Sequence, residues 1–378
     1  MNSNPTRRRF LATSLAAGAL LAVGRMAAAA RPEGVEKKTL LVLGGTGFTG
    51  PFIVETARAR GYAVSIFTRG KTNPDLEFPA DVERIRGNRD PKIEPGLEAL
   101  KGRKFDMVID TSGHVPRHMK ASCEILAPNI GHYVYVSSLS AYASHDTPGA
   151  DESAPLEVLT QETEDYTGDA FGPLKVLCEK AVTEALPGRS AIVRPGLIVG
   201  PRDWSDRFTY WVARVDRGGE VLAPGKPDER VMIIDGRDLA DFLVHLASRK
   251  TSGVFNAIGP DADRKLTMLA ILESAKRASG SDARFTWVSQ EFLEANDMRP
   301  WSVIPLWAPS NGPLAGFHHR SIAAAVKAGI TFRPIDVTVK DTLEFYRAWP
   351  EERRQNLRRG LKPERESELL AKWHAAND

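Results

Sequence analysis

Residues Leu40 to Gly50 read LLVLGGTGFTG, and this stretch is the most informative of the chain. Its four apolar residues, 40–43, are typical of a buried parallel strand. The next residues, 44–50, are rich in glycine, and 52–57 place Phe, Ile, Val and Ala on one face of a helix. A strand, a glycine-rich turn and a helix in this order bring backbone N–H groups and a helix N-terminus up to a pyrophosphate. The stretch therefore predicts a dinucleotide site, with a plain tight turn as the alternative.

Each glycine of the G-x-x-G-x-x-G spacing has its own part in that prediction. Gly44 allows the tight turn, Gly47 lets the phosphates approach the backbone, and Gly50 lets the helix pack close to the strand. A glycine-rich hexad alone is a weak signal, but here it lies in the required strand–turn–helix context.

The first 30 residues are typical of an export signal. A basic start, TRRRFL from Thr6, leads into an apolar run over 10–23 and then into the small residues 27–30. This run is too short to cross a membrane, and its flanks are those of a cleaved signal. The adjacent arginines before Phe10 and Leu11 resemble a twin-arginine signal, which predicts a periplasmic protein. An uncleaved anchor or a chance basic start is the alternative.

Charge and cysteine content exclude several classes of partner. Residues 1–30 contain four arginines and no acidic residue, so the rest of the chain has 47 basic and 48 acidic side chains. We therefore expect no nucleic-acid partner, and no membrane contact after signal removal. Cys123 and Cys178 fall on two predicted helices, where buried thiols are favoured over a disulfide. The spacing of His and Cys predicts no metal site, including at His318 and His319.

The remaining chain alternates strands with helices, which predicts an α/β fold with a doubly wound, Rossmann-type parallel sheet. Apolar strands are expected at 64–69, 82–87, 105–110, 132–138 and 191–195, with helices near 51–60, 116–127 and 173–186. This domain would cover residues 37–200, with a return segment over 231–259. Residues 201–230 and 260–350 are expected to form a smaller C-terminal substrate lobe. Residues 351–378 are highly charged and predict a solvated terminal helix.

Several motifs occur in one order: GGTGFTG, FTRGK, GNRD, YVSSLSAY, FGPLK, RPGLIVGPRD, IDGRDLADF and GVFNAIG. In this order they resemble the extended short-chain dehydrogenase/reductases, the NAD-dependent epimerase/dehydratase family, over residues 37–260. The resemblance implies an NAD(P)-dependent oxidoreductase, epimerase or dehydratase acting on a sugar-like or polyol substrate, and it leaves a homodimer open. FTRGK and FGPLK are also similar to a branch that contains chloroplast stem-loop RNA-binding proteins, so RNA binding is a minor alternative.

The resemblance also assigns residues to the cofactor. At the end of the second strand an acidic residue would favour NAD, but the chain has Arg69, which could pair with a 2′-phosphate. NADP is therefore favoured over NAD, which stays open. Asn88 stands where the family often has an Asp near the adenine. The expected cofactor residues are Gly44, Thr46, Gly47, Phe48, Gly50, Arg69, Asn88, Asp110, Thr111, Ser112, Lys175 and Pro195.

The family's catalytic arrangement is Ser, Tyr and Lys, with Tyr four residues before Lys. It maps here onto Ser138, Phe171 and Lys175, so the Tyr position carries no hydroxyl. Loss of a positioned acid/base typically costs about 10²–10⁴ in rate. Three interpretations stay open: another group transfers the proton, the substrate needs little acid/base help, or the protein binds dinucleotide without turnover. The candidate groups are Tyr166, Tyr142, Asp169, His114 and a water held by Ser138 and Lys175.

The predicted compartment bears on the substrate. Nucleotide sugars and free NAD(P) are cytoplasmic, so an exported enzyme would carry its cofactor and return the hydride within each turnover. That favours epimerisation, dehydration or paired oxidation and reduction of a free sugar, glycoside or polyol. Four tryptophans of the expected substrate lobe would form either the core of that lobe or an aromatic wall for a sugar ring: Trp204, Trp211, Trp301 and Trp307.

Overall fold

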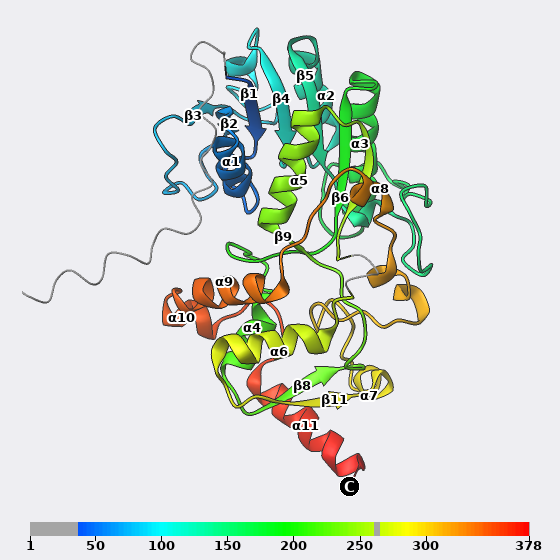
Figure 1. Cartoon of the computed structure of the whole chain (residues 1–378). Coiled ribbons are helices and arrows are strands. Elements are labelled where there is room, and N and C mark those ends of the chain that lie inside the picture. The colour runs from blue at the N-terminus through cyan, green and yellow to red at the C-terminus, as the bar shows by residue number, and fades with distance from the viewer. Residues whose placement is uncertain (1–36, 261–264, 378) are drawn as a thin grey trace, which may run out of the picture. The chain divides into compact units, whose positions relative to one another are not determined.

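The computed structural model describes residues 37–260 and 265–377. The predicted export signal, residues 1–30, lies outside these residues. Residues from Lys38 onward belong to one compact unit. Within that unit lie a central sheet and a second group of helices and strands (Figure 1). The chain passes between them more than once, because residues 253–257 return to the central sheet after the second group has begun.

The central sheet has seven parallel strands in the order β10-β6-β5-β4-β1-β2-β3. Their bounds are β1 (Thr39–Leu43), β2 (Ala63–Thr68), β3 (Glu83–Arg86), β4 (Phe105–Asp110), β5 (Ile130–Val136), β6 (Ser190–Pro195) and β10 (Gly253–Ala257). The predicted strands and the Rossmann-type α/β class are confirmed, with bounds shifted by at most two residues. The chain order reverses between β1 and β4, and ligands of open α/β sheets bind outside the strand ends at such a switch point.

Helices cover both faces of this sheet because its strands are apolar on both sides. On one face α1 (Gly50–Ala59) and α5 (Gly236–Arg249) pack against each other and share a core with the strands. On the other face α2 (Pro116–Leu126) and α3 (Phe171–Ala185) do the same. Cys123 and Cys178 lie on α2 and α3 as free, buried thiols, which confirms that prediction.

The second part of the unit has its own hydrophobic core, which includes Trp211 and Trp307. Its strands are β7 (Ile198–Val199), β8 (Glu220–Pro224), β9 (Ile234–Asp235) and β11 (Arg284–Val288), paired β7 with β9 and β8 with β11. Its helices are α4 (Thr209–Asp216), α6 (Met268–Ser279), α7 (Gln290–Ala295) and α9 (Ile335–Arg347), while α8 (Ala323–Lys327) contacts β10. We call this part the second lobe.

Short 3₁₀ helices occupy several connections. They are η1 (Glu98–Leu100), η2 (Ala127–Asn129), η3 (Leu139–Ala141), η4 (Gly168–Ala170), η6 (Gly312–Leu314) and η7 (Phe317–His319). Two of them, η3 and η4, flank the long connection between β5 and α3. That connection matters for the site below, because it contains Tyr166.

The charged C-terminal residues form two helices, α10 (Glu351–Gln355) and α11 (Pro363–Asn377). The prediction of a solvated terminal helix is wrong for one face of α11, which is buried. Glu366, Leu369 and Leu370 are buried against the second lobe. The Glu366 carboxylate accepts hydrogen bonds from Arg214 Nε at 2.5 Å and from the Leu222 amide at 3.1 Å. A buried charge that is paired and hydrogen-bonded is costly to disrupt, so α11 is part of the fold.

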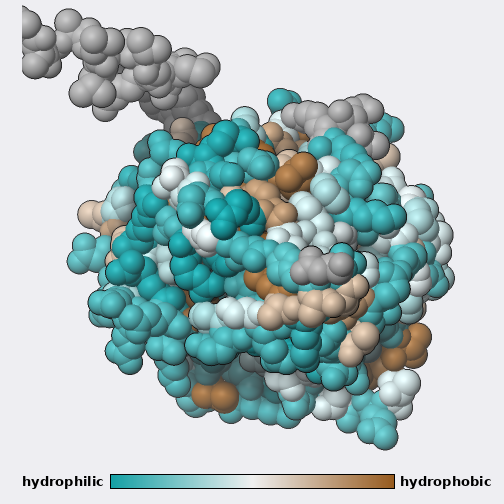
Figure 2. Space-filling model, turned by 90° about the horizontal axis from the view of Figure 1, so that it is seen from below, coloured by the Kyte–Doolittle hydropathy of each residue, from teal (hydrophilic) through white to brown (hydrophobic). Residues whose placement is uncertain are grey.

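Seen from below, the second-lobe end of the molecule is mostly hydrophilic, with apolar side chains in small separate groups (Figure 2). The described part of this end therefore presents a mainly hydrated surface. Among the described helices, none combines the length and hydropathy that a membrane span requires.

Candidate functional site

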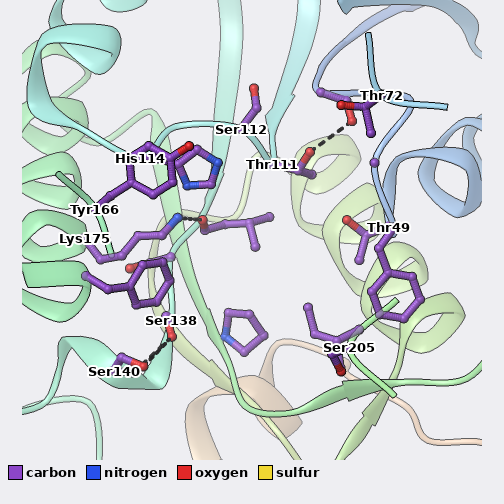
Figure 3. A pocket seen from close by; sticks show the side chains of 18 of the residues that line it. Thr49, Thr72, Thr111, Ser112, His114, Ser138, Ser140, Tyr166, Lys175 and Ser205 are labelled. Carbon is purple, nitrogen blue, oxygen red and sulfur yellow. Dashed lines mark hydrogen bonds between the residues drawn. The ribbon is translucent and has the colours of Figure 1, made fainter. Parts of the chain in front are cut away.

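A cavity of about 840 Å³ lies at the carboxyl ends of the parallel strands. Its walls come from the glycine turn after β1, the ends of β2, β4, β5 and β6, the first turn of α3, and the second lobe. This volume is in the range of ordinary ligand sites. Figure 3 shows Lys175, Tyr166 and His114 on one side of the cavity, with Thr49 and Ser205 across from them.

The glycine turn has the shape that a dinucleotide pyrophosphate needs. Gly44 has φ +96°, and a Cβ on it would lie 2.6 Å from Thr111 Oγ1. A Cβ on Gly50 would lie 2.4 Å from the Gly45 backbone, so this position also requires glycine. Gly47 differs: it lines the cavity, and its Cβ would meet only the Gly44 carbonyl, at 3.6 Å. No side chain caps α1, so its N-terminal amides face the turn without a side-chain partner.

The basic residues after β2 lie beside the same turn. Arg69 is exposed and lines the cavity. Gly70, at φ +71°, leaves room for Arg86, whose Nη1 lies 1.2 Å from the position a Gly70 Cβ would take. The Arg86 guanidinium from β3 therefore lies over Gly70, next to Arg69 in the chain. Sequence reasoning missed Arg86, because an arginine on an edge strand gives no signal of its own.

Asp110 was expected among the cofactor residues, but it does not line the cavity. Its side chain is fully buried behind the cavity wall. Arg89 donates to both carboxylate oxygens at 2.6 Å, and the Tyr133 hydroxyl donates at 2.6 Å. Burial opposes the charge, but the Arg89 guanidinium outweighs it and holds the pKa of Asp110 below its ordinary value. Arg89 Nη1 also donates to Ser112 Oγ at 3.1 Å, so the pair positions a cavity-lining residue.

The other predicted cofactor residues divide simply by place. Those that line the cavity are Gly44, Thr46, Gly47, Phe48, Arg69, Asn88, Thr111, Ser112, Lys175 and Pro195. Gly50 lies behind the turn, where it packs on the Gly45 backbone. Asn88 uses its Oδ1 to accept the Asp90 amide at 3.0 Å, which leaves the amide nitrogen of its side chain for other contacts. Arg89, its neighbour, was missed because nothing in GNRD shows that it is buried.

Lys175 lines the cavity, but its ammonium group is held by three protein oxygens. It donates to Gly113 O at 3.0 Å, Val136 O at 3.0 Å and Tyr135 Oη at 3.1 Å. Burial lowers the pKa of Lys175 to about 8. All three hydrogens of the charged form are used, so a contact with a ribose hydroxyl requires the exchange of one of these bonds.

Phe171 and Ser138 complete the positions that the resemblance assigns to catalysis. The centroid of the Phe171 ring lies 5.8 Å from Lys175 Nζ, so an apolar ring faces the cavity where the family has a phenol. Ser138 Oγ accepts the Ser140 amide at 3.1 Å and donates to Ser140 Oγ at 3.1 Å (Figure 3). Ser138 and Lys175 therefore lie in one cavity, without a proton donor at position 171.

Tyr166 and His114 form a stacked pair in this cavity. Their ring centroids are 4.7 Å apart and their planes differ by 17°, and Tyr166 is 46% exposed (Figure 3). Burial, assisted by the positive charge of Lys175, lowers the pKa of His114 to about 4, so its imidazole is neutral at pH 7. His114 Nδ1 is buried and has no hydrogen-bond partner among the described residues. Two groups able to carry a proton are thus brought together beside Lys175.

The other two candidate side chains lie elsewhere. Tyr142 is 2% exposed, and its hydroxyl donates to Asn256 Oδ1 at 2.7 Å, so it is committed to the fold. Asp169 is exposed in η4 and is not among the lining residues.

The connection that contains Tyr166 is fastened to α2. Arg117 donates from Nε and Nη2 to the Glu164 carboxylate at 2.9 and 2.7 Å, and it also pairs with Asp90. Glu164 is two residues from Tyr166. The Arg117 ion pair therefore holds this part of the connection at the cavity mouth.

Of the four tryptophans expected in the substrate lobe, two line the cavity and two lie in the core of the lobe. Trp204 and Trp301 line the cavity, whereas Trp211 and Trp307 belong to the core of the second lobe. His318 is buried: its Nδ1 accepts the Met232 amide at 3.0 Å, and its Nε2 lies 2.9 Å from Leu306 O. Within residues 37–260 and 265–377, no group of His, Cys, Asp and Glu has the arrangement of a metal site.

Known proteins match this chain in sequence and in fold. The sequence model of the NAD dependent epimerase/dehydratase family matches residues 40–258, more than half of the chain. The chloroplast stem-loop binding protein of 41 kDa b from Arabidopsis thaliana is 24% identical over 262 residues, which are 65% of this chain and 64% of that protein. The chain therefore spans less than two thirds of the length of this curated relative.

Two solved structures share the fold at low identity. UDP-glucuronic acid 4-epimerase from Bacillus cereus in complex with NAD is 14% identical, with a TM-score of 0.57 over 81% of this chain and 98% of that chain. Human epimerase family protein SDR39U1 with NADPH is 19% identical, with a TM-score of 0.52 over 81% of this chain and 99% of that chain. At these identities the likeness establishes the fold alone.

Proposed function

Because the chain belongs to the NAD dependent epimerase/dehydratase family, we propose that it is an NAD(P)-dependent oxidoreductase or epimerase in which Tyr166 transfers the proton that Phe171 cannot. The observation that carries the proposal is the Tyr166–His114 stack, 4.7 Å between centroids, in the same cavity as Lys175 and Ser138. The glycine turn fits the dinucleotide, as Gly47 leaves its cavity side open.

The roles of the residues follow from their surroundings. A bound NAD or NADP supplies a group that can take up a hydride and give it back. Tyr166 would exchange the proton of the substrate hydroxyl, and neutral His114, stacked on the Tyr166 ring, would position the phenol. Ser138 would hold the substrate oxygen.

Export and substrate class are also part of the proposal. An exported protein would retain its dinucleotide, so the hydride has to return to the substrate in each turnover, as in epimerisation or dehydration. A sugar-like or polyol substrate is supported by the aromatic side chains Trp204 and Trp301 on the second-lobe wall. The fold neighbours named above bind NAD or NADPH, and one of them is a sugar-nucleotide epimerase.

The cofactor is tested first. The full chain is expressed, the exported protein is purified and denatured, and the released nucleotide is identified by mass spectrometry. We expect close to one NAD(H) or NADP(H) per chain. A protein that is empty and also fails to bind added NAD or NADP would contradict the proposal.

The proton-transfer step is tested with two substitutions. Sugars and polyols are screened for reduction of the bound cofactor, followed at 340 nm in a single turnover. Tyr166→Phe should lower the rate by about 10²–10⁴, whereas Phe171→Tyr should give no gain. A large gain in rate with Phe171→Tyr, together with an unchanged rate for Tyr166→Phe, would show that a proton donor is needed at position 171 and that Tyr166 does not transfer the proton.

A second candidate, dinucleotide binding without turnover, is favoured by one observation. The three hydrogens of the Lys175 ammonium are all used on protein oxygens, so the lysine is already satisfied without a ribose. In that case the cofactor would copurify, but no sugar would reduce it. Stem-loop binding, from the printed name of the plant relative, is a further alternative that a gel-shift assay with a stem-loop RNA would test.

A further inference from the structure

Arg207 is a cation on the substrate side of the cavity that makes no ion pair within the described chain, although the Asp203 carboxyl group lies near enough to stabilise its charge. Four Lys and Arg side chains of the described chain line this cavity: Arg69, Arg89, Lys175 and Arg207. Arg89 is paired with Asp110, and Lys175 is held by three oxygens. Arg69 lies at the end of β2, on the cofactor side. Arg207 precedes α4 of the second lobe, and no ion pair joins it to a carboxylate of residues 37–260 or 265–377.

The guanidinium of Arg207 is oriented but not saturated. Its Nε donates to Ser205 Oγ at 3.3 Å, and its Cζ lies 5.4 Å from the centroid of the Trp301 ring. Neither terminal nitrogen makes a hydrogen bond to the described chain. The two Nη groups are therefore available as a planar fork, the geometry that binds a carboxylate in a bidentate way.

The aromatic wall beside Arg207 is held in a strained backbone. Trp301 has φ 62°, which is an outlier for a bulky residue, and its ring packs edge-on against Phe317 with centroids 4.6 Å apart. Arg202 and Asp206, which flank the turn before Arg207, also have positive φ, at 70° and 62°. Left-handed backbone at residues other than glycine is unfavourable and concentrates at functional sites. The cost is consistent with a wall whose shape serves a ligand.

A carboxyl group lies close to Arg207 on the same wall. Asp203 Oδ1 accepts the Ser205 amide at 2.8 Å, so Asp203 and Arg207 are linked through the same serine. Burial raises the pKa of Asp203 and lowers that of Arg207, each charge partly opposes the shift of the other, and the guanidinium stays charged at neutral pH. A diphosphate would bring two or more negative charges to a wall on which, among the described residues, Arg207 is the one lining cation of the second lobe, beside the Asp203 carboxyl group.

We propose that Arg207 binds a carboxylate of the substrate, so that the substrate is an acidic sugar, such as a uronate or aldonate, whose carbon skeleton lies along Trp301. This inference rests on the proposed function and names its substrate class.

The test measures binding to the full exported chain saturated with NAD or NADP. D-Galacturonate and D-glucuronate are compared by calorimetry with D-galactose, D-glucose, glucose 1-phosphate and UDP-glucose. We expect at least one acid to bind about 10- to 100-fold more tightly than its neutral parent, as for hydrogen bonds to a charged group. Equal binding of acid and neutral sugar, no binding of either acid at millimolar concentration, or an Arg207-dependent preference for a phosphate or UDP compound would overturn it.

Variants show whether Arg207 makes the difference. Arg207→Gln should reduce the affinity of the acid to that of the neutral sugar and leave the affinity for the dinucleotide unchanged. Arg207→Lys keeps the charge without the fork and should lose part of the preference, which keeps the test open if the first variant is unstable. Arg277→Gln removes an exposed arginine of the second lobe that does not line the cavity, and it should change nothing. Failure to bind dinucleotide would refute the proposed function, whereas bound dinucleotide without acid preference refutes only this inference.

Discussion

Single residues of the cavity separate charges that the protein neutralises from charges that stay free for a ligand. Arg89 and Asp110 neutralise each other behind the cofactor side. Lys175 is charged but fully hydrogen-bonded, with its pKa lowered by burial to about 8. Arg69 and Arg207 make no ion pair with the described chain, and they line the cavity from different elements: Arg69 follows β2, whereas Arg207 precedes α4 of the second lobe. These two arginines are therefore the ones that we expect to bind anionic groups: Arg69 a phosphate of the cofactor, and Arg207 a carboxylate of the substrate.

Arg69 and Arg86 give a prediction about the choice between NADP and NAD. A 2′-phosphate at the end of β2 would lie between the Arg69 side chain and the Arg86 guanidinium that covers Gly70. Arg69→Gln and Arg86→Gln should each weaken NADP binding about 10-fold and leave NAD binding nearly unchanged. Titration with NADP and with NAD, followed by tryptophan fluorescence, measures both affinities.

The control is Arg84→Gln on the same strand. Arg84 is exposed, and it donates to Leu76 O away from the turn. If Arg84→Gln weakened NADP as much as Arg86→Gln, or if NADP and NAD weakened equally, the two arginines would act through general charge rather than through the 2′-phosphate.

At the level of elements, the strand–turn–helix unit makes two glycines serve different purposes. Gly50 packs on the Gly45 backbone, whereas Gly47 faces the cavity. The nearest atom to a Cβ built on Gly47 would be the Gly44 carbonyl oxygen, at 3.6 Å. One glycine is therefore required by the fold and the other by the ligand, although both belong to the same motif.

This difference predicts opposite results for two alanine substitutions. Gly50→Ala should destabilise the protein by about 1–3 kcal/mol, because its Cβ would lie 2.4 Å from backbone atoms of Gly45. Gly47→Ala should leave the melting temperature of the cofactor-free protein nearly unchanged and weaken NAD binding at least ~10-fold, since its methyl group would occupy space next to the pyrophosphate. A stability loss at Gly47 equal to that at Gly50 would contradict this assignment.

Elements with one strong local signal were predictable from sequence. The central strands are continuous apolar runs, and the glycine turn has a fixed spacing, so both were placed within two residues. Arg89 and Glu366 were not, because burial of a charge depends on a partner far along the chain: Asp110 for Arg89, and Arg214 for Glu366. The Tyr166–His114 stack also joins residues from separate connections, and no periodicity predicts it.

At the level of the whole molecule, the cavity exists only where the sheet and the second lobe meet. The glycine turn and Lys175 come from the first part, whereas Arg207, Trp301 and Phe317 come from the second. Sequence motifs identified the cofactor wall, since it is local. The substrate wall is assembled from a turn before α4 and from residues nearly a hundred positions later, so it needs the tertiary structure.

Stability of the whole molecule should depend on pH through its buried histidines. Burial lowers the pKa of His114, His132, His145 and His318 to about 4. An unfolded histidine has a pKa near ~6.5, so between pH 6.5 and pH 4 the unfolded chain binds protons that the folded chain does not. Stability from these groups is therefore present above pH 6.5 and is lost as the pH falls toward 4.

The contribution of the two most buried histidine rings to the pH dependence of the free energy of unfolding can be calculated. His132 and His318 are 0% and 2% exposed. Each proton taken up on unfolding changes the free energy of unfolding by about 1.4 kcal/mol per pH unit, so these two contribute up to about 2.7 kcal/mol per pH unit to the slope. His114 and His145 add to it in the same direction. Guanidinium unfolding at pH 6.5, 6.0, 5.5 and 5.0 measures the slope above the range in which carboxylates titrate.

His318→Gln separates this cause from general acid destabilisation. The ring makes two hydrogen bonds, to the Met232 amide and to Leu306 O, so the variant should be less stable at pH 7. Its slope between pH 6.5 and 5.0 should nevertheless be smaller than that of the natural chain by about 1.4 kcal/mol per pH unit, because one proton is no longer taken up on unfolding. An unchanged slope would mean that His318 is protonated in the folded protein, and a stability that rises as the pH falls would contradict the sign of the whole argument.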